Sequence, residues 1–253
     1  MISPAVMQKW VEGRVVDQKR WTQTLFSLKV EAEVAAFEAG QFGKLALAVG
    51  DEMVARPYSF VNAPGERPHE FYYVKLPDGP LTQRLCRLGA GDTVYMAPRP
   101  AGFLVLSEVP QGENLWLISS GTGIGPFLSI LKTEAPWQRF KRVVLVHAVR
   151  RAEELTYRDS IERLAREHAE QMRTVCFVSR EAKQGALPGR VPAAIEEGRL
   201  EAAAGVVLSA GTSQVMICGN PDMVRDTSAA LGRRGMKKHR RRDPGHITVE
   251  NYW

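Results

Sequence analysis

Cysteine is scarce in this sequence of 253 residues, which holds three: Cys86, Cys176 and Cys218. An odd number of widely spaced cysteines does not make a disulfide framework, because such frameworks use an even number of cysteines in a dense pattern. The sequence also lacks a C-x-x-C pair. We therefore expect neither a zinc clip nor an iron–sulfur cluster.

Long apolar runs are absent as well. The longest, such as LWLISSG (115–121) and VVLVHAV (143–149), fall short of the roughly 20 residues that a membrane-spanning helix needs. The start of the chain, MISPAVMQKW, lacks the charged segment, apolar core and cleavage site of a secretory signal. These absences predict a globular, cytoplasmic protein without a membrane-spanning helix.

A net positive charge is nearly absent from most of the chain, although the whole chain carries a net charge of +6. Residues 1–232 hold 27 Lys and Arg against 26 acids, whereas residues 233–253 hold seven against two. The excess lies in RRGMKKHRRR (233–242), which is either a solvated helix end and loop or a docking patch for an acidic macromolecule. We do not expect nucleic acid there, because an ordered-looking segment follows the cluster and no nucleic-acid-binding motif surrounds it.

The two halves of the chain differ in their hydrophobic periodicity. Up to about residue 106, short alternating or β-branched runs are separated by Gly, Pro and Asp turns, which predicts an antiparallel β-barrel. From about residue 113, apolar strands alternate with helices, which predicts a parallel sheet with helices on its faces. We expect a two-domain fold, with the barrel over residues 1–108 and an α/β domain over residues 109–253.

The segment GTGIGP (121–126) joins an apolar strand to an amphipathic helix, the context of a dinucleotide-binding turn. Glycines let the backbone approach a pyrophosphate, and Pro126 suits the first helical position, where its missing N–H is no loss. The pattern departs from G-x-G-x-x-G. An ordinary tight turn between strand and helix is therefore the alternative interpretation.

Arginines follow the next two strands. VVLVHAV ends in Arg150 and Arg151, where a fold that prefers NAD would carry an acid, and RTVCFVS is followed by Arg180. Strand tips at one end of a parallel sheet line a shared crevice, so Arg150 and Arg180 can converge on one phosphate, with Arg190 reaching in from a loop. Forked guanidinium groups suit the 2'-phosphate of NADP. Each arginine taken alone is equally typical of a solvated surface.

In the first half, RPYSFVNAP (56–64) places a cation, an aromatic ring and a hydroxyl close together. Arg56 can neutralise a diphosphate, Tyr58 can stack on a flat ring, and Ser59 can form a hydrogen bond with it. Strand alternation puts Ser59 on the face opposite to the other two, so one ligand meets all three only across an edge or a bend. The alternative interpretation is a plain edge strand that carries a tyrosine.

Four motifs together resemble the bacterial ferredoxin-NADP reductases: R-P-Y-S, G-T-G-I-G-P, C-G-N-P and E-N-Y-W. They occur in the family's order and spacing over nearly the whole chain. The resemblance implies an FAD-binding barrel, an NADP domain, and reversible transfer of hydride from NADPH to flavin and of single electrons onward to ferredoxin or flavodoxin. It also implies that the carrier docks on the basic cluster from Arg233 to Arg242.

The resemblance carries over to individual residues. It implies flavin contacts by Arg56, Tyr58, Ser59, Tyr73, Val74, Lys75, Leu81, Thr82 and Thr122. For NADP it implies contacts by Gly121, Gly123, Gly125, Arg150, Arg180, Arg190, Cys218 and Gly219.

By the same resemblance the end of the chain returns to the flavin. Tyr252 is expected to cover the face of the isoalloxazine ring that nicotinamide must reach, and Trp253 to stack on the adenine of FAD. Aromatic stacking contributes only about 0.5 to 1.5 kcal/mol beyond burial, so the tyrosine can move aside for the coenzyme. The alternative is a tail that packs on its own core.

The resemblance also implies that the catalytic residues are Ser59, Cys218, Glu250 and Tyr252, which position nicotinamide against flavin without a covalent step. Cys218 ends a buried strand, so a plain core cysteine is its alternative reading, and Glu250 can simply solubilise the tail. Hydride transfer needs no histidine base, and His147, inside a strand, is expected to be a core residue whose hydrogen bonds are satisfied.

Three other functions stay open on the sequence. The first is the reductase component of an oxygenase, or a general flavin reductase, on the same scaffold. The second is an electron-transfer subunit of a larger complex, although the expected cysteine cluster is missing from the tail. The third is a protein without enzymatic activity that binds nucleic acid, which a purified protein lacking flavin would favour.

Overall fold

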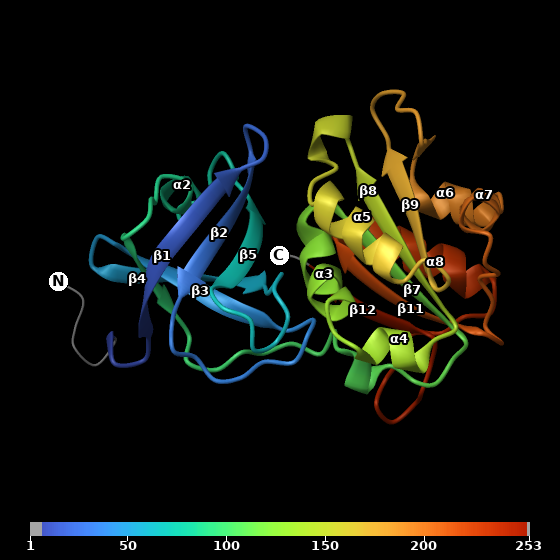
Figure 1. Ribbon diagram of the computed structural model, residues 1–253, viewed down its shortest axis with the longest axis horizontal. Coiled ribbons are helices and arrows are strands. Elements are labelled where there is room, and N and C mark those ends of the chain that lie inside the picture. The colour runs from blue at the N-terminus through green and yellow to red at the C-terminus, as the bar shows by residue number, and fades with distance from the viewer. Residues whose placement is uncertain (1–6, 252–253) are drawn as a thin grey trace. The chain divides into compact units, whose positions relative to one another are not determined.

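The computed structural model describes residues 7–251, and the chain divides into two compact units, Met1–Phe103 (unit 1) and Leu104–Trp253 (unit 2) (Figure 1). The boundary expected between residues 108 and 109 falls slightly later than this division. The Arg139 side chain in unit 2 explains the shift, because it donates hydrogen bonds to the carbonyl oxygens of Leu106 and Val109. These bonds tie residues 106–109 to unit 2.

Unit 1 is an antiparallel sheet in the order β4-β3-β6-β1-β2-β5. Its edge strands approach each other where Phe60 bridges Phe71 and where the Val61 N–H donates to the Glu70 carbonyl at 2.9 Å, which gives the expected barrel. The elements are β1 (Val11–Arg20), β2 (Leu25–Glu31), β3 (Phe42–Val49), β4 (Glu52–Ser59), β5 (His69–Val74), α2 (Thr82–Leu85) and β6 (Thr93–Met96).

The barrel interior is filled by apolar residues from alternate strand positions. Leu28, Leu45, Phe71 and Met96 are fully buried and belong to one hydrophobic cluster, which Leu85 of α2 joins. The alternation of inward and outward side chains that predicted strands in this half is therefore the pattern that builds the core.

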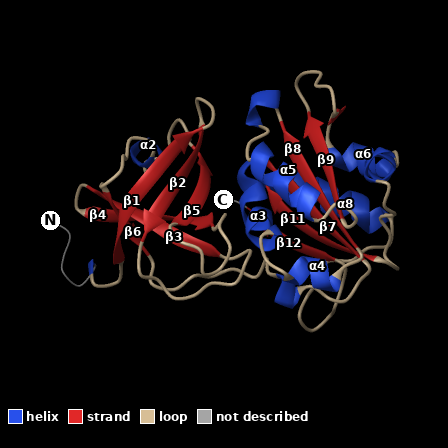
Figure 2. Ribbon diagram, viewed as in Figure 1, coloured by secondary structure: helices blue, strands red, loops and turns tan. Residues whose placement is uncertain are grey.

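Unit 2 is a sheet of parallel strands in the order β10-β9-β8-β7-β11-β12, as expected (Figure 2). The strands are β7 (Asn114–Ser120), β8 (Arg142–Val149), β9 (Met172–Val178), β10 (Ala186–Pro188), β11 (Ser213–Gly219) and β12 (Ile247–Asn251). The helices and 3-10 turns are η1 (Leu106–Glu108), η2 (Gly121–Ile124), α3 (Gly125–Leu131), α4 (Ala135–Arg139), η3 (Ala152–Glu154), α5 (Arg158–Glu167), α6 (Val191–Glu196), α7 (Arg199–Ala204) and α8 (Pro221–Arg233).

The central strands of unit 2 are apolar at nearly every position because both of their faces are covered. Trp116 and Ile118 of β7 pack with residues of α6, α7 and α8 in one cluster. Leu115 and Leu117 alternate with them and are equally buried, so they face the other side of the sheet. This continuous apolar sequence identifies strands buried on two faces.

No helix within residues 7–251 is long and apolar enough to cross a membrane. The cytoplasmic location expected from the sequence stays a prediction.

Candidate functional site

Strand β4 presents the R-P-Y-S motif at its end in unit 1. Arg56 is exposed, and its guanidinium donates to the carbonyl of Ala55 at 2.7 Å. The Tyr58 ring is half-buried and meets the Tyr73 ring edge-on, with centroids 6.0 Å apart. Ser59, in contrast, is buried. The alternation inferred from the sequence therefore agrees with the exposure of Arg56 and the burial of Ser59.

The two tyrosines are held as neutral phenols. Burial raises the pKa of Tyr58 well above its usual value, although the nearby Arg56 lowers it slightly. Burial also raises the pKa of Tyr73, whose hydroxyl donates to Gln18 Oε1 at 2.6 Å. The Tyr73 side chain is thus committed to the barrel interior, and the Tyr58 ring remains an uncharged flat surface.

The remaining predicted flavin residues of unit 1 surround the turn before α2. Val74 and Lys75 are half-buried at the end of β5, and Leu81 is buried in the barrel core. Thr82 Oγ1 accepts a hydrogen bond from the N–H of Leu76 at 3.1 Å and lies 3.4 Å from the Gly79 carbonyl, to which it donates. The side chains of Leu81 and Thr82 therefore fix this turn.

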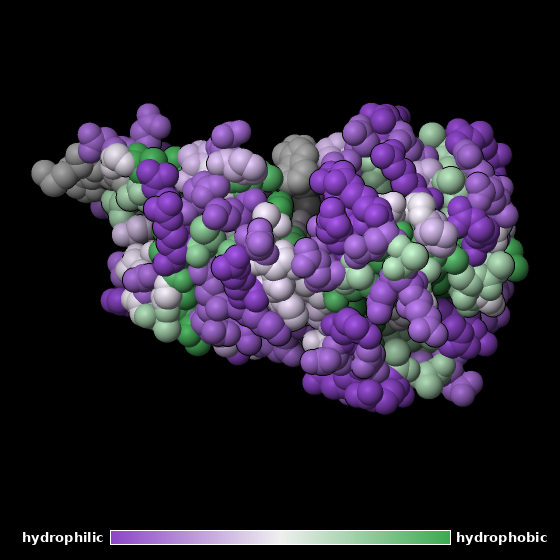
Figure 3. Space-filling model, turned by 90° about the horizontal axis from the view of Figure 1, so that it is seen from above, coloured by the Kyte–Doolittle hydropathy of each residue, from purple (hydrophilic) through white to green (hydrophobic). Residues whose placement is uncertain are grey.

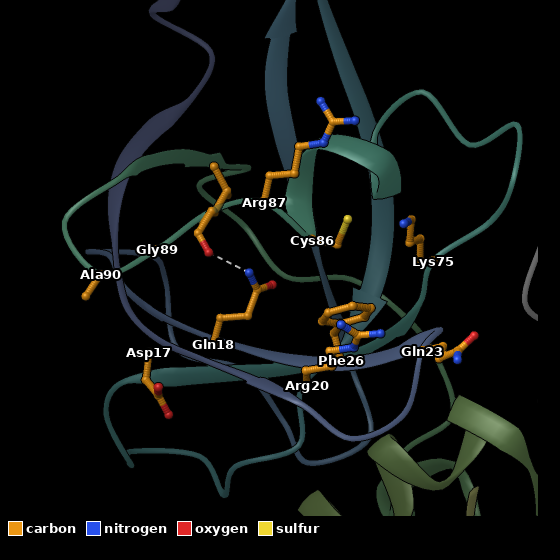
Figure 4. A pocket seen from close by; sticks show the side chains of 11 residues that line it. Asp17, Gln18, Arg20, Gln23, Phe26, Lys75, Cys86, Arg87, Gly89 and Ala90 are labelled. Carbon is orange, nitrogen blue, oxygen red and sulfur yellow. Dashed lines mark hydrogen bonds between the residues drawn. The ribbon is translucent and has the colours of Figure 1, made fainter.

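A pocket of about 520 Å³ lies beside this turn (Figure 4). Of the predicted flavin residues, its lining includes Lys75. Gln18 is another lining residue, and its side-chain amide donates to the Leu88 carbonyl. No sequence pattern marks this pocket, because its lining comes from separated segments: Asp17, Gln18, Arg20, Gln23, Phe26, Lys75, Cys86, Arg87, Leu88, Gly89 and Ala90.

Two glycine turns interlock at one end of the unit 2 sheet. A Cβ atom on Gly123 would lie 2.3 Å from the carbonyl oxygen of Cys218, and one on Gly219 would lie 2.3 Å from Ser120 Oγ. The N–H of Asn220 also donates to Ser120 Oγ at 3.0 Å. Only glycine allows this close approach, so the G-T-G-I-G-P and C-G-N-P motifs form a single structure.

The helix beginnings next to these turns differ from each other. Gly121, with φ of +54°, opens the 3-10 turn η2, so that α3 begins only at Gly125, with Pro126 at its start. Thr122 is half-buried within η2. Helix α8 is capped by Asn220, whose Oδ1 accepts from the N–H of Asp222 at 3.0 Å. The first N–H groups of α8 are thus capped by the Asn220 side chain, whereas α3 follows the glycine turn without a side-chain cap.

Arginines follow three neighbouring strands at the same end of the sheet. Arg150 follows β8 and Arg180 follows β9, and the Arg180 N–H donates to the Arg150 carbonyl at 2.9 Å. Arg190 follows β10, which pairs in parallel with β9. All three are exposed, and none makes an ion pair within residues 7–251. The backbones that carry Arg150 and Arg180 therefore meet at the strand tips, and the convergence of their guanidinium groups on one phosphate stays a prediction.

Figure 3 looks onto the end of unit 2 toward which the β8 and β9 arrows point in Figure 1, and the surface of unit 2 there is largely hydrophilic.

Arg151 differs from Arg150, Arg180 and Arg190 in having an acidic partner, because its guanidinium lies 3.7 Å from the carboxylate of Glu181. Sequence reasoning missed Glu154 and Glu181, which bind the backbone beside Arg150. No local signal marks them, because acids are common in such turns.

Cys218 and Glu250 are brought together by strand register. They are paired neighbours on β11 and β12, and Cys218 is fully buried. Burial raises the pKa of Glu250 to about 7, so this carboxyl is partly protonated near neutral pH. Tyr252 and Trp253, with which the sequence argument closed the site, lie outside the described residues.

His147 is a core residue, as expected, but the expectation that its hydrogen bonds are satisfied is wrong. Its Nε2 atom is buried and has no hydrogen-bond partner within residues 7–251. Burial lowers the pKa of His147 to about 4, so the imidazole stays neutral. A neutral ring tolerates the missing partner better than a buried charge would.

Acids neutralise a large part of the basic cluster 233–242. Arg233 pairs with Glu196 and Arg234 with Glu201. Two further pairs are Lys237 with Asp243, at 2.5 Å, and Arg241 with Glu108, at 2.5 Å.

The other three cations of the cluster are Lys238, Arg240 and Arg242. They are exposed and have no ion pair among the residues that the structure describes. The charge of the cluster that is free to act on a partner is therefore smaller than the sequence suggests.

Comparison with known proteins shows which proteins share this sequence and fold. Residues 117–229 match the family model of the oxidoreductase NAD-binding domain. The chain is 49% identical over 248 residues to a flavodoxin/ferredoxin–NADP reductase of Shigella flexneri, covering 98% of this chain and 100% of that protein. It is 35% identical to a ferredoxin–NADP reductase of Pseudomonas aeruginosa over 94% of this chain and 95% of the relative.

Among solved structures, a ferredoxin NADP+ reductase from Neisseria gonorrhoeae with bound FAD and NADP superposes with a TM-score of 0.92 at 34% identity. The superposition covers 97% of this chain and 99% of that chain. Full-length identity of this degree, together with the paired glycine turns, shows that the chain belongs to the flavodoxin/ferredoxin–NADP reductase family.

Proposed function

We propose that the protein is an FAD-dependent reductase that oxidises NADPH and passes the electrons singly to ferredoxin or flavodoxin, in a reversible reaction. The observation that carries the proposal is the arrangement in unit 2, where interlocked glycine turns lie at the same sheet end as unpaired arginines. This arrangement occurs in a chain that matches flavodoxin/ferredoxin–NADP reductases over nearly its full length.

Unit 2 is proposed to bind NADP. Gly121, Gly123 and Gly125 let the backbone approach the pyrophosphate closely, and the free N–H groups of the turn donate to it. The 2'-phosphate would be held by Arg150, Arg180 and Arg190. Because these arginines are not engaged by carboxylates of the described residues, their charge is available to a dianion.

Unit 1 fits a flavin, because β4 offers an exposed cation, an uncharged ring and a buried hydroxyl in four residues. FAD bound there would supply the ability to accept a hydride and to release electrons one at a time. Tyr58 would stack on the ring system, Arg56 would neutralise the diphosphate, and Ser59 would donate a hydrogen bond. Tyr73, Val74, Lys75, Leu81, Thr82 and Thr122 are proposed to complete the contacts.

In this proposal Thr82 and Leu81 contribute to FAD binding indirectly, because their side chains stabilise the turn before α2. Their side chains are engaged by Leu76, Gly79 and the barrel core, so the contact they offer a diphosphate is the backbone at the start of α2. The proposed contact of Tyr73 is likewise through its backbone, since its hydroxyl is bonded inside the barrel.

The reacting groups are proposed to be positioned by Ser59, Cys218 and Glu250, with Tyr252 and Trp253 as the aromatic cover of the flavin. Orientation is the protein's main contribution to hydride transfer, because no acid or base is required at the reacting carbon. Cys218 and Gly219 would contact the nicotinamide end of the coenzyme. The pKa of about 7 lets Glu250 hold or release a proton at its carboxylate near neutral pH.

The carrier is proposed to dock on a basic patch within 233–242. The cations that carry the proposal are Lys238, Arg240 and Arg242, because the other four are engaged by acids of unit 2. A patch with three unpaired cations steers an acidic carrier and weakens with rising salt.

The proposed function is tested by mixing the purified protein anaerobically with NADPH and following the visible flavin absorption, then adding ferredoxin or flavodoxin. The expected result is bleaching by NADPH and recovery of the absorption when the carrier is added. Protein that purifies without flavin, or that is bleached equally well by NADH and reduces no carrier, would instead favour a general flavin reductase or a binding protein.

A further inference from the structure

We infer that Glu181 limits recognition of the 2'-phosphate by withdrawing Arg151 from it, which leaves Arg150 as the phosphate-binding cation at the tip of β8. This specificity-determining role rests on the proposed binding of NADP in unit 2. Arg150 and Arg151 both follow β8, but their surroundings differ.

The tips of β8 and β9 are joined by their backbones. The Ser179 N–H donates to the Val149 carbonyl at 3.1 Å, and the Arg180 N–H donates to the Arg150 carbonyl at 2.9 Å. This pairing carries the next residue, Glu181, to a position beside the start of η3. Glu181 is therefore placed by the same contacts that bring Arg150 and Arg180 together.

Glu181 is anchored at one oxygen and paired at the other. Its Oε1 accepts from the N–H of Ala152 at 2.6 Å, and its Oε2 lies 3.7 Å from Arg151 Nη1. Because the backbone contact already orders the carboxylate, holding Arg151 costs less side-chain entropy than in an ordinary surface pair. The Arg151 guanidinium is thereby directed toward an acid.

The backbone of this tip is fixed by a second acid. Glu154 Oε2 accepts from the N–H of Arg150 at 2.8 Å and from that of Arg151 at 3.1 Å. Both side chains thus leave a constrained backbone, yet only Arg151 has a carboxylate partner among the described residues. Glu181 is therefore the group that distinguishes the charge environment of Arg151 from that of Arg150.

Removing the charge of Glu181 has two effects in the same direction. Arg151 becomes available to the phosphate, and a negative charge near the incoming dianion disappears. Since surface pairs of this kind are weak, the expected gain in affinity is about two- to five-fold at low salt.

The test measures, by titration calorimetry at low salt, the Kd of 2'-phospho-AMP and of 5'-AMP for the purified protein. In the Glu181→Gln variant the amide oxygen still accepts from Ala152, and we expect the Kd of 2'-phospho-AMP to fall about two- to five-fold while that of 5'-AMP stays unchanged. Adding Arg151→Ala to this variant should cancel most of the gain. The matched control is Glu153→Gln, which removes an exposed acid of the same turn.

An unchanged Kd in Glu181→Gln, a gain that Arg151→Ala does not diminish, or an equal gain in Glu153→Gln would each overturn the inference. Arg150→Ala separates the inference from the proposed function. If that variant does not weaken 2'-phospho-AMP relative to 5'-AMP, the proposed phosphate site itself is wrong. If it does and Glu181→Gln has no effect, only the role of Glu181 fails.

Discussion

At the scale of single residues, the proposed coenzyme-binding end of unit 2 depends on two glycines, because a side chain at either position would not fit. Gly123 and Gly219 are packed against backbone and side-chain atoms of the opposite turn at distances that no Cβ atom tolerates. The backbone at Gly219 also has a φ of +137°, which side chains disfavour. Each motif therefore determines the shape of the other.

Replacing Gly123 by alanine is expected to separate the two turns, because the new methyl group would overlap the Cys218 carbonyl. Overpacking of this kind costs about 1 to 3 kcal/mol of unfolding free energy, and the KM for NADPH should rise with it. Urea unfolding and steady-state kinetics check both effects. Gly211→Ala is the control, since no atom lies within 4 Å of the added carbon, and equal losses in both variants would contradict the argument.

Two buried histidines predict how stability responds to acid. Burial lowers the pKa of His69 to about 4, with help from Arg67, and burial lowers that of His147 to about 4. Between their ordinary pKa of about 6.5 and these values, the unfolded chain binds protons that the folded protein does not. Unfolding free energy should therefore fall as the pH drops from 6.5 toward 4, by up to about 3 kcal/mol per histidine.

The measurement is urea unfolding of the wild type and of His147→Leu at a series of pH values. The variant should lose part of the slope between pH 6.5 and 4. A slope identical to that of the wild type would show that His147 is not neutral and buried in solution.

Residues at strand tips could be predicted from the sequence, whereas their partners could not. The arginines after two parallel strands must lie at one sheet end, and the Arg150–Arg180 contact confirms this. The pairing of Arg151 with Glu181 was missed, because it depends on a hydrogen bond between segments about thirty residues apart. The buried His147 Nε2 without a hydrogen-bond partner was also missed, because the sequence does not show which groups surround a core side chain.

At the scale of elements, the short helix α2 depends on the turn that precedes it. Thr82 bonds both Leu76 and Gly79 with one hydroxyl, and a Cβ atom on Gly79 would lie 2.4 Å from that oxygen. The turn and the first residue of α2 therefore form one rigid corner, and the proposed diphosphate contact lies on it.

Thr82→Val removes the hydroxyl while keeping the shape of the side chain. The Leu76 N–H loses its acceptor, which should cost about 1 to 3 kcal/mol, and FAD should be released more readily in gel filtration. Thr133→Val is the matched control, because Thr133 makes one similar bond to the Ile130 carbonyl in unit 2. Full retention of FAD by Thr82→Val would contradict the proposed role of this corner.

Strands with a clear period were predictable from the sequence, whereas the three-residue strand β10 was not. The fully apolar β7 and β8 and the alternating β1 were recognised because burial on two faces or on one determines their composition. Strand β10, Ala186–Pro188, was read only as a Gly/Pro-rich stretch, since three residues carry no period. Its pairing with β9 nevertheless places Arg190.

At the scale of the whole molecule, the net charge of +6 suggests more unpaired positive charge in the basic patch than the structure shows. Seven Lys and Arg in residues 233–242 suggested a strong attractant, but four are matched by acids. Lys237 pairs with the nearby Asp243, and the other three pair with acids that are distant in sequence: Glu108, Glu196 and Glu201. Charge counts along a sequence cannot detect such pairs. The proposed docking cations are therefore the three that remain.

Charge reversal at Arg240 should raise the KM for ferredoxin or flavodoxin several-fold at low salt and reduce the salt dependence, because a surface charge mainly affects association. The oxidation of NADPH by ferricyanide should be unaffected. Arg166→Glu is the control, since Arg166 is an exposed cation of α5 without an ion pair among residues 7–251. A carrier KM that responds equally to both variants would contradict the patch.

The central claim is that unit 2 selects the phosphorylated coenzyme for a flavin in unit 1. It is tested most directly by stopped-flow bleaching of the flavin with NADPH and with NADH, in the wild type and in Arg150→Ala/Arg180→Ala. The account predicts a strong preference for NADPH that nearly disappears in the double variant, with the rate for NADH little changed. A wild type that prefers NADH, or a double variant that still discriminates fully, would contradict it.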